Sequence, residues 1–224
     1  REIRLAAYEF DKMRKRISVH LNQRSEMLSG ISHDLRTPLT RLKLQLALLN
    51  QKDLAKKMSD DIEEMERMLN EYLEFSRNQK TEETEIVNIE NLINDVIKKY
   101  DSKKIKFSFE ESIKINMRIN AIKRCIVNLI DNSLSYGKNV EISTQHKNNN
   151  LIIYIDDDGP GIPPEEYVNV MKPFYRIDKS RGQNMSGVGL GLSITNDIIV
   201  SHGGKIVLDK SFKNGLRVMI SLPL

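Results

Sequence analysis

The amino-acid sequence predicts an α+β protein in two parts: an N-terminal two-helix hairpin that forms a dimeric four-helix bundle, followed by an α/β sandwich. Up to about residue 78, apolar residues recur at intervals of three and four, which is the pattern of packed helices. Beyond residue 84, helical segments are interspersed with short alternating segments typical of strands. We expect a first segment over 1–19, the helical domain over 20–80 and the sandwich over 81–224, with a polar linker at 81–84.

The composition excludes several classes of protein. The chain has 224 residues, 39% of them hydrophobic and 29% charged, as in ordinary globular domains. Its net charge is +4, but basic and acidic residues are interleaved, so we expect no nucleic-acid partner. The longest apolar stretches, at 46–49 and 151–155, are too short to cross a bilayer. Since the chain begins without Met and already in helical rhythm, we expect it to be a fragment of a longer protein.

The helical part carries one apolar stripe on each of its two helices. Asn50 to Asp53 interrupt the rhythm, and Asp53 can cap the second helix. Because a two-helix hairpin cannot enclose both stripes, the pattern predicts a homodimer. An intrachain coiled coil that packs on the second domain is the alternative. The stripes consist of Ile3, Ala6, Phe10, Met13, Ile17, Leu21, Leu28, Ile31, Leu35, Leu42, Leu46 and Leu49, then Leu54, Met58, Ile62, Met65, Leu69, Tyr72 and Phe75.

The second part alternates between helices and strands. Two short polar segments, 147–150 and Asn214-Gly215, are typical hairpin turns. The single cysteine, Cys125, lies among Ile122 and Ile126 and is expected to be a small buried hydrophobe. The predicted helices are 89–100, 119–134 and 192–202, and the predicted strands are 104–110, 140–145, 151–155, 205–208 and 216–222.

Two glycine-rich segments indicate a nucleotide pocket. The first, 156–162, follows a strand; glycines there let the backbone approach a ligand, and a carboxylate can accept a hydrogen bond from adenine N6. The second, 186–192, runs into a helix whose N-terminal amides suit phosphate oxygens. It is not a P-loop, because no Gly-Lys-Ser/Thr follows. The candidate ligand residues are Asp157, Gly159, Gly161, Gly187, Gly189, Leu190 and Gly191.

The residues between the glycine segments and the helix before them add polar candidates. Residues 176–182 form either a mobile lid whose Arg176, Lys179 or Arg181 meets phosphates, or a solvated loop without a ligand. On the helix 119–134, Asn128, Asn132 and Tyr136 lie on one face, opposite the apolar residues. A hydrated Mg2+ that bridges phosphates would satisfy the carboxamides; capping by nearby backbone is the alternative.

Five motifs resemble those of the sensor histidine kinases of two-component systems, and most closely those of the EnvZ type. They occur in the family's order across the chain. The matching segments are the H box, Ser32-His-Asp-Leu-Arg-Thr-Pro-Leu39; the N box, Asn128-Leu-Ile-Asp-Asn-Ser133; the first glycine box, Asp157-Asp-Gly-Pro-Gly161; the F box, Lys172-Pro-Phe-Tyr-Arg176; and the second glycine box, Gly187-Val-Gly-Leu-Gly191.

The resemblance implies a role for each helical motif. His33 would be the phosphoacceptor, Asp34 its acidic partner and Thr37 the residue that supports dephosphorylation of a response regulator. Pro38 has no N–H to donate to the carbonyl of Asp34, so we expect a kink in the helix beside His33. Through this kink, signals from the N-terminal helix would change the geometry of His33. Residues 1–19 would end a HAMP module.

The resemblance also implies the cofactors and partners. In the ATP-binding domain, of the fold shared with gyrase and Hsp90, Asn132 would bind Mg2+, Asp157 would read adenine and Tyr136 would pack on it. Asn128 stands where gyrase-like ATPases carry a general-base glutamate. We expect ATP and Mg2+ as cofactors, a response-regulator receiver domain as partner, and the cytoplasmic portion of a bacterial inner-membrane protein anchored through segments outside this chain.

Three departures from the family pattern keep two alternatives open. Ser135 stands where many relatives have a basic residue, Ser133 replaces a common alanine, and Met171 replaces an aromatic of the F box. The alternatives to a kinase are a gyrase- or Hsp90-like ATPase and a non-catalytic dimer scaffold.

Overall fold

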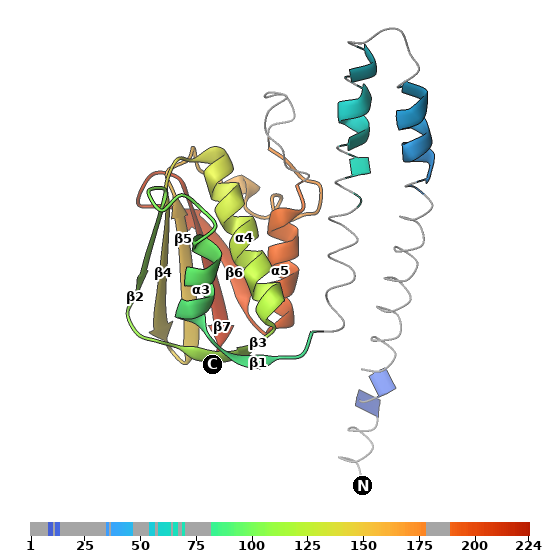
Figure 1. Cartoon of the computed structure of the whole chain (residues 1–224). Coiled ribbons are helices and arrows are strands. Elements are labelled where there is room, and N and C mark those ends of the chain that lie inside the picture. The colour runs from blue at the N-terminus through green and yellow to red at the C-terminus, as the bar shows by residue number, and fades with distance from the viewer. Residues whose placement is uncertain are drawn as a thin grey trace. The chain divides into compact units, whose positions relative to one another are not determined.

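The computed structural model describes residues 82–177 and 189–224, together with 9–10, 12–13, 35, 37–46, 54–56, 58–63, 65–66 and 69. The chain divides into two compact units, Arg1–Lys80 and Thr81–Leu224 (Figure 1). The predicted helix break at 50–53 and the linker residue Thr81 lie outside the described residues.

The first unit contains two helical stretches that lie side by side. Residues 37–46, which include Pro38, and residues 58–63 are helical. Lys43 Nζ lies 2.7 Å from Glu66 Oε2, and Leu46 and Ile62 are each only 6% exposed. Lys43 thus links the two stretches, which run in opposite directions, as the hairpin prediction requires (Figure 1).

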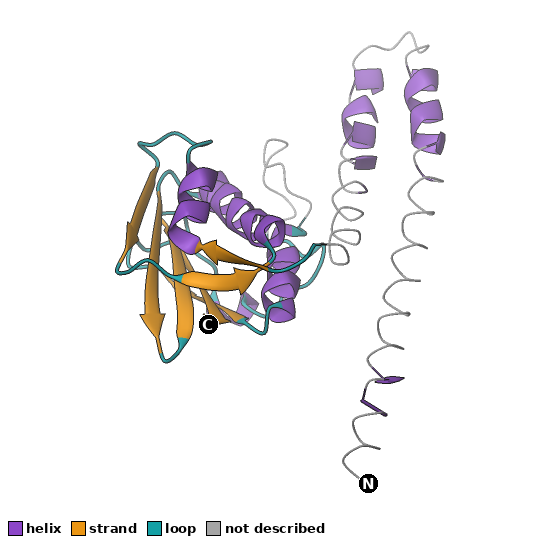
Figure 2. Ribbon diagram, turned by 60° about the horizontal axis from the view of Figure 1, so that its bottom comes forward, coloured by secondary structure: helices purple, strands orange, loops and turns teal. Residues whose placement is uncertain are grey.

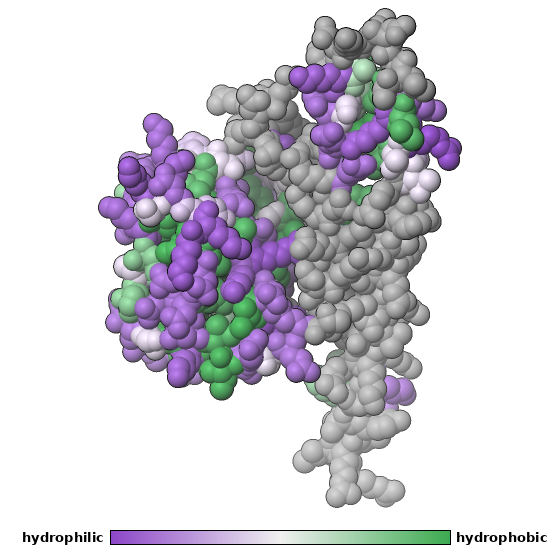
Figure 3. Space-filling view, viewed as in Figure 1, coloured by the Kyte–Doolittle hydropathy of each residue, from purple (hydrophilic) through white to green (hydrophobic). Residues whose placement is uncertain are grey.

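Much of the hairpin's apolar surface is uncovered within one chain. Several large apolar side chains are between 41% and 65% exposed, and apolar atoms reach the surface of the hairpin's described part (Figure 3). Apolar surface of this kind on helices is buried when two hairpins pair as a bundle. These side chains are Leu35, Leu42, Leu44, Leu54, Met58 and Met65.

The second unit is built on a five-stranded sheet with the order β2-β4-β5-β7-β6. All its pairings are antiparallel except the parallel pair of β2 and β4. A separate two-stranded sheet pairs β1 with β3, antiparallel (Figure 2). The strands are β1 (Glu85–Asn88), β2 (Ile105–Phe109), β3 (Lys114–Met117), β4 (Val140–Lys147), β5 (Asn150–Asp157), β6 (Lys205–Lys210) and β7 (Leu216–Pro223).

Three helices cover one face of this sheet and complete the sandwich (Figure 1). They are α3 (Ile89–Ile97), α4 (Ile119–Tyr136) and α5 (Gly191–Ser201), and a short 3-10 helix, η1, spans Pro164–Glu166. Since side chains alternate along a strand, only one set of residues of each central strand faces the helices. The central side chains of this core are fully buried, namely Ile93, Ile126, Ile130, Ile142, Ile153, Ile155 and Ile220.

The predicted α+β fold is confirmed, and all five predicted strands and three predicted helices of this unit are present with ends shifted by a few residues. The β4–β5 turn has positive φ at Asn148 and Asn149, and Asn214 of the β6–β7 turn has φ of 71°, in agreement with both predicted hairpins. Cys125 is fully buried as predicted. The strands β1 and β3 were not predicted, because each is only four residues long and pairs with a distant segment.

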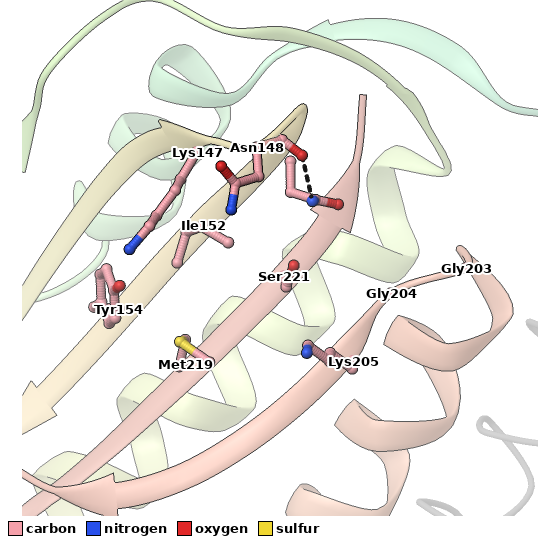
Figure 4. Close-up of a pocket in the computed structure, with 10 residues that line it drawn as sticks. Lys147, Asn148, Ile152, Tyr154, Gly203, Gly204, Lys205, Met219 and Ser221 are labelled. Carbon is pink, nitrogen blue, oxygen red and sulfur yellow. Dashed lines mark hydrogen bonds between the residues drawn. The ribbon is translucent and has the colours of Figure 1, made fainter.

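The opposite face of the sheet is open to solvent and carries paired charges. The Asp156 carboxylate is 2% exposed and accepts two hydrogen bonds from Arg217, Nε to Oδ1 at 2.9 Å and Nη2 to Oδ2 at 3.0 Å. The same face has a shallow hollow between Lys147 and Lys205, with Tyr154 and Met219 in its floor (Figure 4). No helix among the described residues is long and apolar enough to cross a membrane.

Candidate nucleotide-binding site

The helix α4 presents two different faces, as its sequence predicts. Ile122, Ile126 and Leu129 are at most 1% exposed and pack into the core, whereas Asn128 and Asn132 are half-buried on the other side. The Asn128 Nδ2 is buried and has no hydrogen-bond partner within the described structure. An unpaired buried amide costs about 1–3 kcal/mol. Capping by nearby backbone therefore does not account for the Asn128 Nδ2, which remains without an acceptor.

The N-terminal end of α5 lies beside this carboxamide. Its N-cap residue, Leu190, makes no side-chain cap, and among the described residues no other side chain is seen to accept from the first amides of the helix. Among the described residues, a Cβ built on Gly191 would approach the Asn128 Cβ, at 3.9 Å. The start of α5, which has no cap from its N-cap side chain, and the unpaired Asn128 amide therefore lie side by side, and this combination suits phosphate oxygens.

The other end of the site is the carboxylate of Asp157, the last residue of β5. Asp157 is 3% exposed, and its Oδ1 accepts hydrogen bonds from Gly159 N at 2.9 Å and Leu216 N at 3.0 Å. Burial raises the pKa of Asp157, and these hydrogen bonds, together with one from the Ser133 side chain, oppose that shift. The fold thus holds an acceptor of fixed orientation at this position, where an exocyclic amine can donate to it.

The first glycine box is packed against the chain itself. A Cβ on Gly159 would lie 3.0 Å from both the Tyr136 carbonyl oxygen and Asp157 Oδ1, and Gly161 has φ of +71°. A Cβ on Gly215, in the β6–β7 turn, would lie 2.2 Å from Asp157 Oδ1. These glycines therefore let two turns close around Asp157. The packing of the chain is thus a second reason for glycine at these positions, besides the predicted approach of a ligand.

The neighbouring Asp158 fixes the loop that follows α4. Its Oδ1 accepts hydrogen bonds from Lys138 N at 2.6 Å and Asn139 N at 2.9 Å, and its Oδ2 from Asn139 Nδ2 at 2.7 Å. The bonds from Asn139, the largest effect, and from Lys138 lower the pKa of Asp158 to about 2. This loop follows Tyr136, whose side chain is 50% exposed, so the position of the aromatic ring depends on the same contacts.

The segment between the two glycine boxes has its ends held together. Phe174 N donates to the Gly189 carbonyl oxygen at 3.0 Å, and Phe174 has φ of 63°. A Cβ on Gly189, whose φ is +78°, would lie 3.0 Å from the Tyr175 carbonyl oxygen. The Tyr175 hydroxyl donates to Glu166 Oε2 at 2.7 Å, which raises the pKa of Tyr175. Phe174 and Gly189, which flank the predicted lid 176–182, are thus held together, while Lys179, Arg181 and Gly187 lie outside the described residues.

The structure brings together most of the predicted nucleotide residues, and it adds three. Asn128, Asn132 and Tyr136 come from α4; Asp157, Gly159 and Gly161 from the end of β5; and Gly189, Leu190 and Gly191 from the start of α5. Of the H-box residues, Thr37 is helical and exposed, while His33 and Asp34 lie outside the described residues. The prediction missed the support that Asp158, Gly215 and Leu216 give to the site. The Asn-Gly turn signal was visible, but no sequence signal linked it to a carboxylate 58 residues away.

Comparisons with known proteins agree with this geometry. Residues 23–81 match the family model for the His Kinase A (phospho-acceptor) domain, and residues 117–224 match the model for the histidine kinase-, DNA gyrase B- and HSP90-like ATPase. A fold with an ATPase domain of this type behind a phosphoacceptor domain defines a histidine kinase. The chain belongs to the sensor histidine kinases of two-component systems, as the motifs predicted.

Individual relatives give the extent of the similarity. The chain is 35% identical to the sensor histidine kinase GtrS of Pseudomonas aeruginosa over 97% of its own length and 46% of that protein. It is 32% identical to the sensor histidine kinase CpxA of Escherichia coli over its full length and 52% of that protein. The catalytic domain of the histidine kinase ThkA, 27% identical, superimposes with a TM-score of 0.54 over 63% of this chain and 95% of that structure. The chain spans about half the length of the curated relatives it matches.

Replacing Asp157 by Asn is expected to separate folding from ligand recognition. Because burial raises the pKa of Asp157, the ionised carboxylate costs stability as the pH rises through that pKa. The variant should therefore be at least as stable at pH 7 in urea denaturation. Its affinity for adenine nucleotides should fall roughly 10- to 100-fold, since a hydrogen bond to a charged group contributes about 1.5–3 kcal/mol. Calorimetric titration measures this, with the exposed Asp95→Asn on α3 as control; unchanged affinity would exclude Asp157 as the adenine reader.

Replacing Gly191 by Ala tests the phosphate end of the site. Within the described part of the chain, the new methyl group would have the Asn128 Cβ at 3.9 Å as its nearest neighbour, and Gly→Ala at a compatible backbone position stabilises by about 0.4–1 kcal/mol. The free energy of unfolding should therefore stay the same or increase. Binding of a non-hydrolysable ATP analogue should weaken about tenfold, because the methyl group occupies the space beside Asn128 and displaces a phosphate contact of about 1.4 kcal/mol. If the variant and the unchanged protein bind the analogue with equal affinity, the phosphate groups do not bind beside Gly191.

Proposed function

We propose that this chain is the kinase portion of a sensor protein that transfers the γ-phosphoryl group of ATP to His33 and then to an aspartate of a response regulator. The observation that supports it most is the unpaired Asn128 amide beside the uncapped start of α5. The family of the chain supplies the second support, because its members pair this ATP-binding domain with a phosphoacceptor histidine.

In the proposed first step, the imidazole of His33 attacks the γ-phosphorus. Near neutral pH, a fraction of a histidine's imidazole is unprotonated and therefore nucleophilic. Asp34 would accept a hydrogen bond from Nδ1–H, so that the lone pair of Nε2 forms the new N–P bond. The bond from phosphorus to the β,γ-bridging oxygen breaks, and ADP leaves with that electron pair. In the second step, a carboxylate oxygen of the regulator takes the phosphoryl group and restores the free imidazole.

The chain's residues fit a magnesium nucleotide. The described residues contain no group of three or more His, Cys, Asp or Glu side chains placed to hold a metal ion. A cation would therefore be held by the Asn132 carboxamide oxygen, by phosphate oxygens and by water, which suits the preference of Mg2+ for oxygen ligands. When bound, Mg2+ would neutralise phosphate charge; the other candidates, Asp157 and Tyr136, would orient the adenine.

Asn128 favours phosphotransfer over hydrolysis. In gyrase-like ATPases, a glutamate at this position accepts a proton from the attacking water, as the resemblance implies. A carboxamide is not a base, so Asn128 cannot take that proton. The pocket would hold ATP without activating water, and the nucleophile must then come from the phosphoacceptor helix. This argues against the ATPase alternative, and the free Asn128 amide argues against a scaffold without nucleotide.

The remaining assignments belong to the same proposal. The uncovered apolar side chains of the hairpin, such as Leu35 and Met58, support a homodimer. We assign 1–19 to the end of a HAMP module, 20–80 to dimerisation and phosphotransfer, and 81–224 to ATP binding, in the cytoplasmic portion of an inner-membrane protein. A receiver domain would dock on the helices near Arg41 and Leu42, both exposed in this chain.

The kinase assignment predicts a chemically distinctive product. Incubation with γ-labelled ATP should give protein-bound label that acid removes and alkali does not, and His33→Gln should abolish it because the nucleophile is lost. His146→Gln is a suitable control, since His146 is an exposed histidine of the other unit. Release of free phosphate without protein-bound label would instead identify an ATPase, and neither product would identify a scaffold.

Thr37 is expected to serve dephosphorylation of the regulator and not autophosphorylation. It lies four residues after His33, on the same face of a regular helix, and it is exposed. Its hydroxyl could orient a water toward the phosphoaspartate. Thr37→Ala should lower the rate of regulator dephosphorylation about tenfold, the equivalent of one hydrogen bond, and change autophosphorylation less than twofold. Thr40→Ala, three residues further along the same helix, serves as the control; equal dephosphorylation by both variants would contradict this role.

A further inference from the structure

We propose that Glu82 is a positioning residue for autophosphorylation, because it fastens the linker between the two units to the helix that carries the nucleotide asparagines. This inference rests on the proposed kinase function. Glu82 is the second residue of the ATP-binding unit and precedes β1 by three residues. It is therefore the first described residue of the chain that enters this unit.

Glu82 caps α4 from a distance in sequence. The N-cap residue Arg118 makes no side-chain cap of its own. Instead, Glu82 Oε1 accepts from Asn120 N at 2.5 Å, and Glu82 Oε2 accepts from Ala121 N at 3.1 Å. Both carboxylate oxygens thus satisfy amides that a helix start leaves without partners, and a negative charge is favourable at this end of the helix dipole.

The same attachment point includes the end of α5. The Arg118 guanidinium donates to the Ser201 hydroxyl, and Arg118 N donates to His202 Nε2 at 3.2 Å. His202 Nδ1 lies 2.7 Å from the Ile198 carbonyl oxygen, and with Nε2 accepting from Arg118 this geometry fits a neutral ring with its proton on Nδ1. Burial, the largest effect, lowers the pKa of His202 and agrees with this neutral form. The start of α4, the end of α5 and the linker residue Glu82 therefore meet at one place.

This place is at the far ends of the two helices that form the phosphate end of the site. The start of α4 and the end of α5 lie together near β1, while the opposite end of α5 carries Gly191, beside Asn128 (Figure 1). Because a helix is stiff, the position of Glu82 relative to the bound nucleotide is fixed while the cap is intact. The connection, or tether, between the two units then ends at residue 82 and does not extend to the start of β1.

Loss of the cap would free residues 82–84 and add up to about 10 Å of flexible chain, at roughly 3.3–3.6 Å per residue. A longer and less directed tether lowers the effective concentration of one unit at the other. The nucleotide site itself is untouched, so the effect should fall on the transfer step and not on ATP binding.

The test compares Glu82→Ala with Glu83→Ala in the whole chain. Glu83 has the same charge, is exposed, and lies one residue away. We expect Glu82→Ala to lower kcat of autophosphorylation about three- to tenfold, the size of a modest misplacement of reacting groups, with KM for ATP within twofold. Glu82→Gln, which keeps one acceptor, should recover at least half of the rate. A kcat of Glu82→Ala equal to that of Glu83→Ala, or a rise in KM that matches the fall in kcat, would overturn the proposal.

Hydrogen exchange separates this proposal from the kinase assignment. In Glu82→Ala, the amides of Asn120 and Ala121 should exchange at least tenfold faster than in Glu83→Ala, whether or not either protein phosphorylates itself. Unchanged exchange at both amides would show that the cap does not form and would overturn the positioning role. Faster exchange in a protein that never acquires phosphohistidine would instead refute the kinase function.

Discussion

The double role of α4 is the constraint on which the rest of the ATP-binding unit depends. One face of this helix must bury Ile122, Ile126, Leu129 and Ile130 against the sheet, and burial of each such side chain contributes about 1.5–3 kcal/mol. The other face must keep two carboxamides away from that core. Since residues four apart share a face, the apolar packing that holds the helix in place also fixes where Asn128 and Asn132 point.

The site then forms where three chain reversals meet this helix. The loop after α4 is held by Asp158, the turn after β5 closes over Asp157, and the β6–β7 turn supplies Gly215 and the Leu216 amide. Asp157 is buried at an energetic cost, since its carboxylate loses water, and the backbone amides of Gly159 and Leu216 compensate in part. In return, a charge held in place by amides is already oriented for a ligand, so no reorganisation is needed on binding.

The sequence predicted those features of the fold and the candidate site that depend on residues close together in the chain. The helices, the strands and the two hairpins follow from periodicity and from turn residues such as Asn214 and Gly215, and the motifs gave Asn128, Asp157 and Gly191 as candidate site residues. The pairing of β1 with β3, the bond from Leu216 to Asp157 and the cap from Glu82 to Asn120 join residues 26 to 59 positions apart. No periodicity encodes such contacts, because they depend on which elements become neighbours after folding. The sequence predicted that Gly159 and Gly161 let a ligand approach, but not that they let the chain pack around Asp157, for the same reason.

The chemistry of Asn128 explains why the connection between the units matters. A pocket with a carboxylate at this position could complete hydrolysis by itself, whereas a carboxamide leaves the bound nucleotide without a base. Under the proposed mechanism, the rate then depends on how often an imidazole on a separately folded unit reaches the γ-phosphorus. That frequency is set by the length and direction of the tether more than by the pocket. A signal that alters the phosphoacceptor helices can therefore regulate transfer without changing a single contact to ATP, which is a physical reason for dividing the nucleophile and the nucleotide between two units.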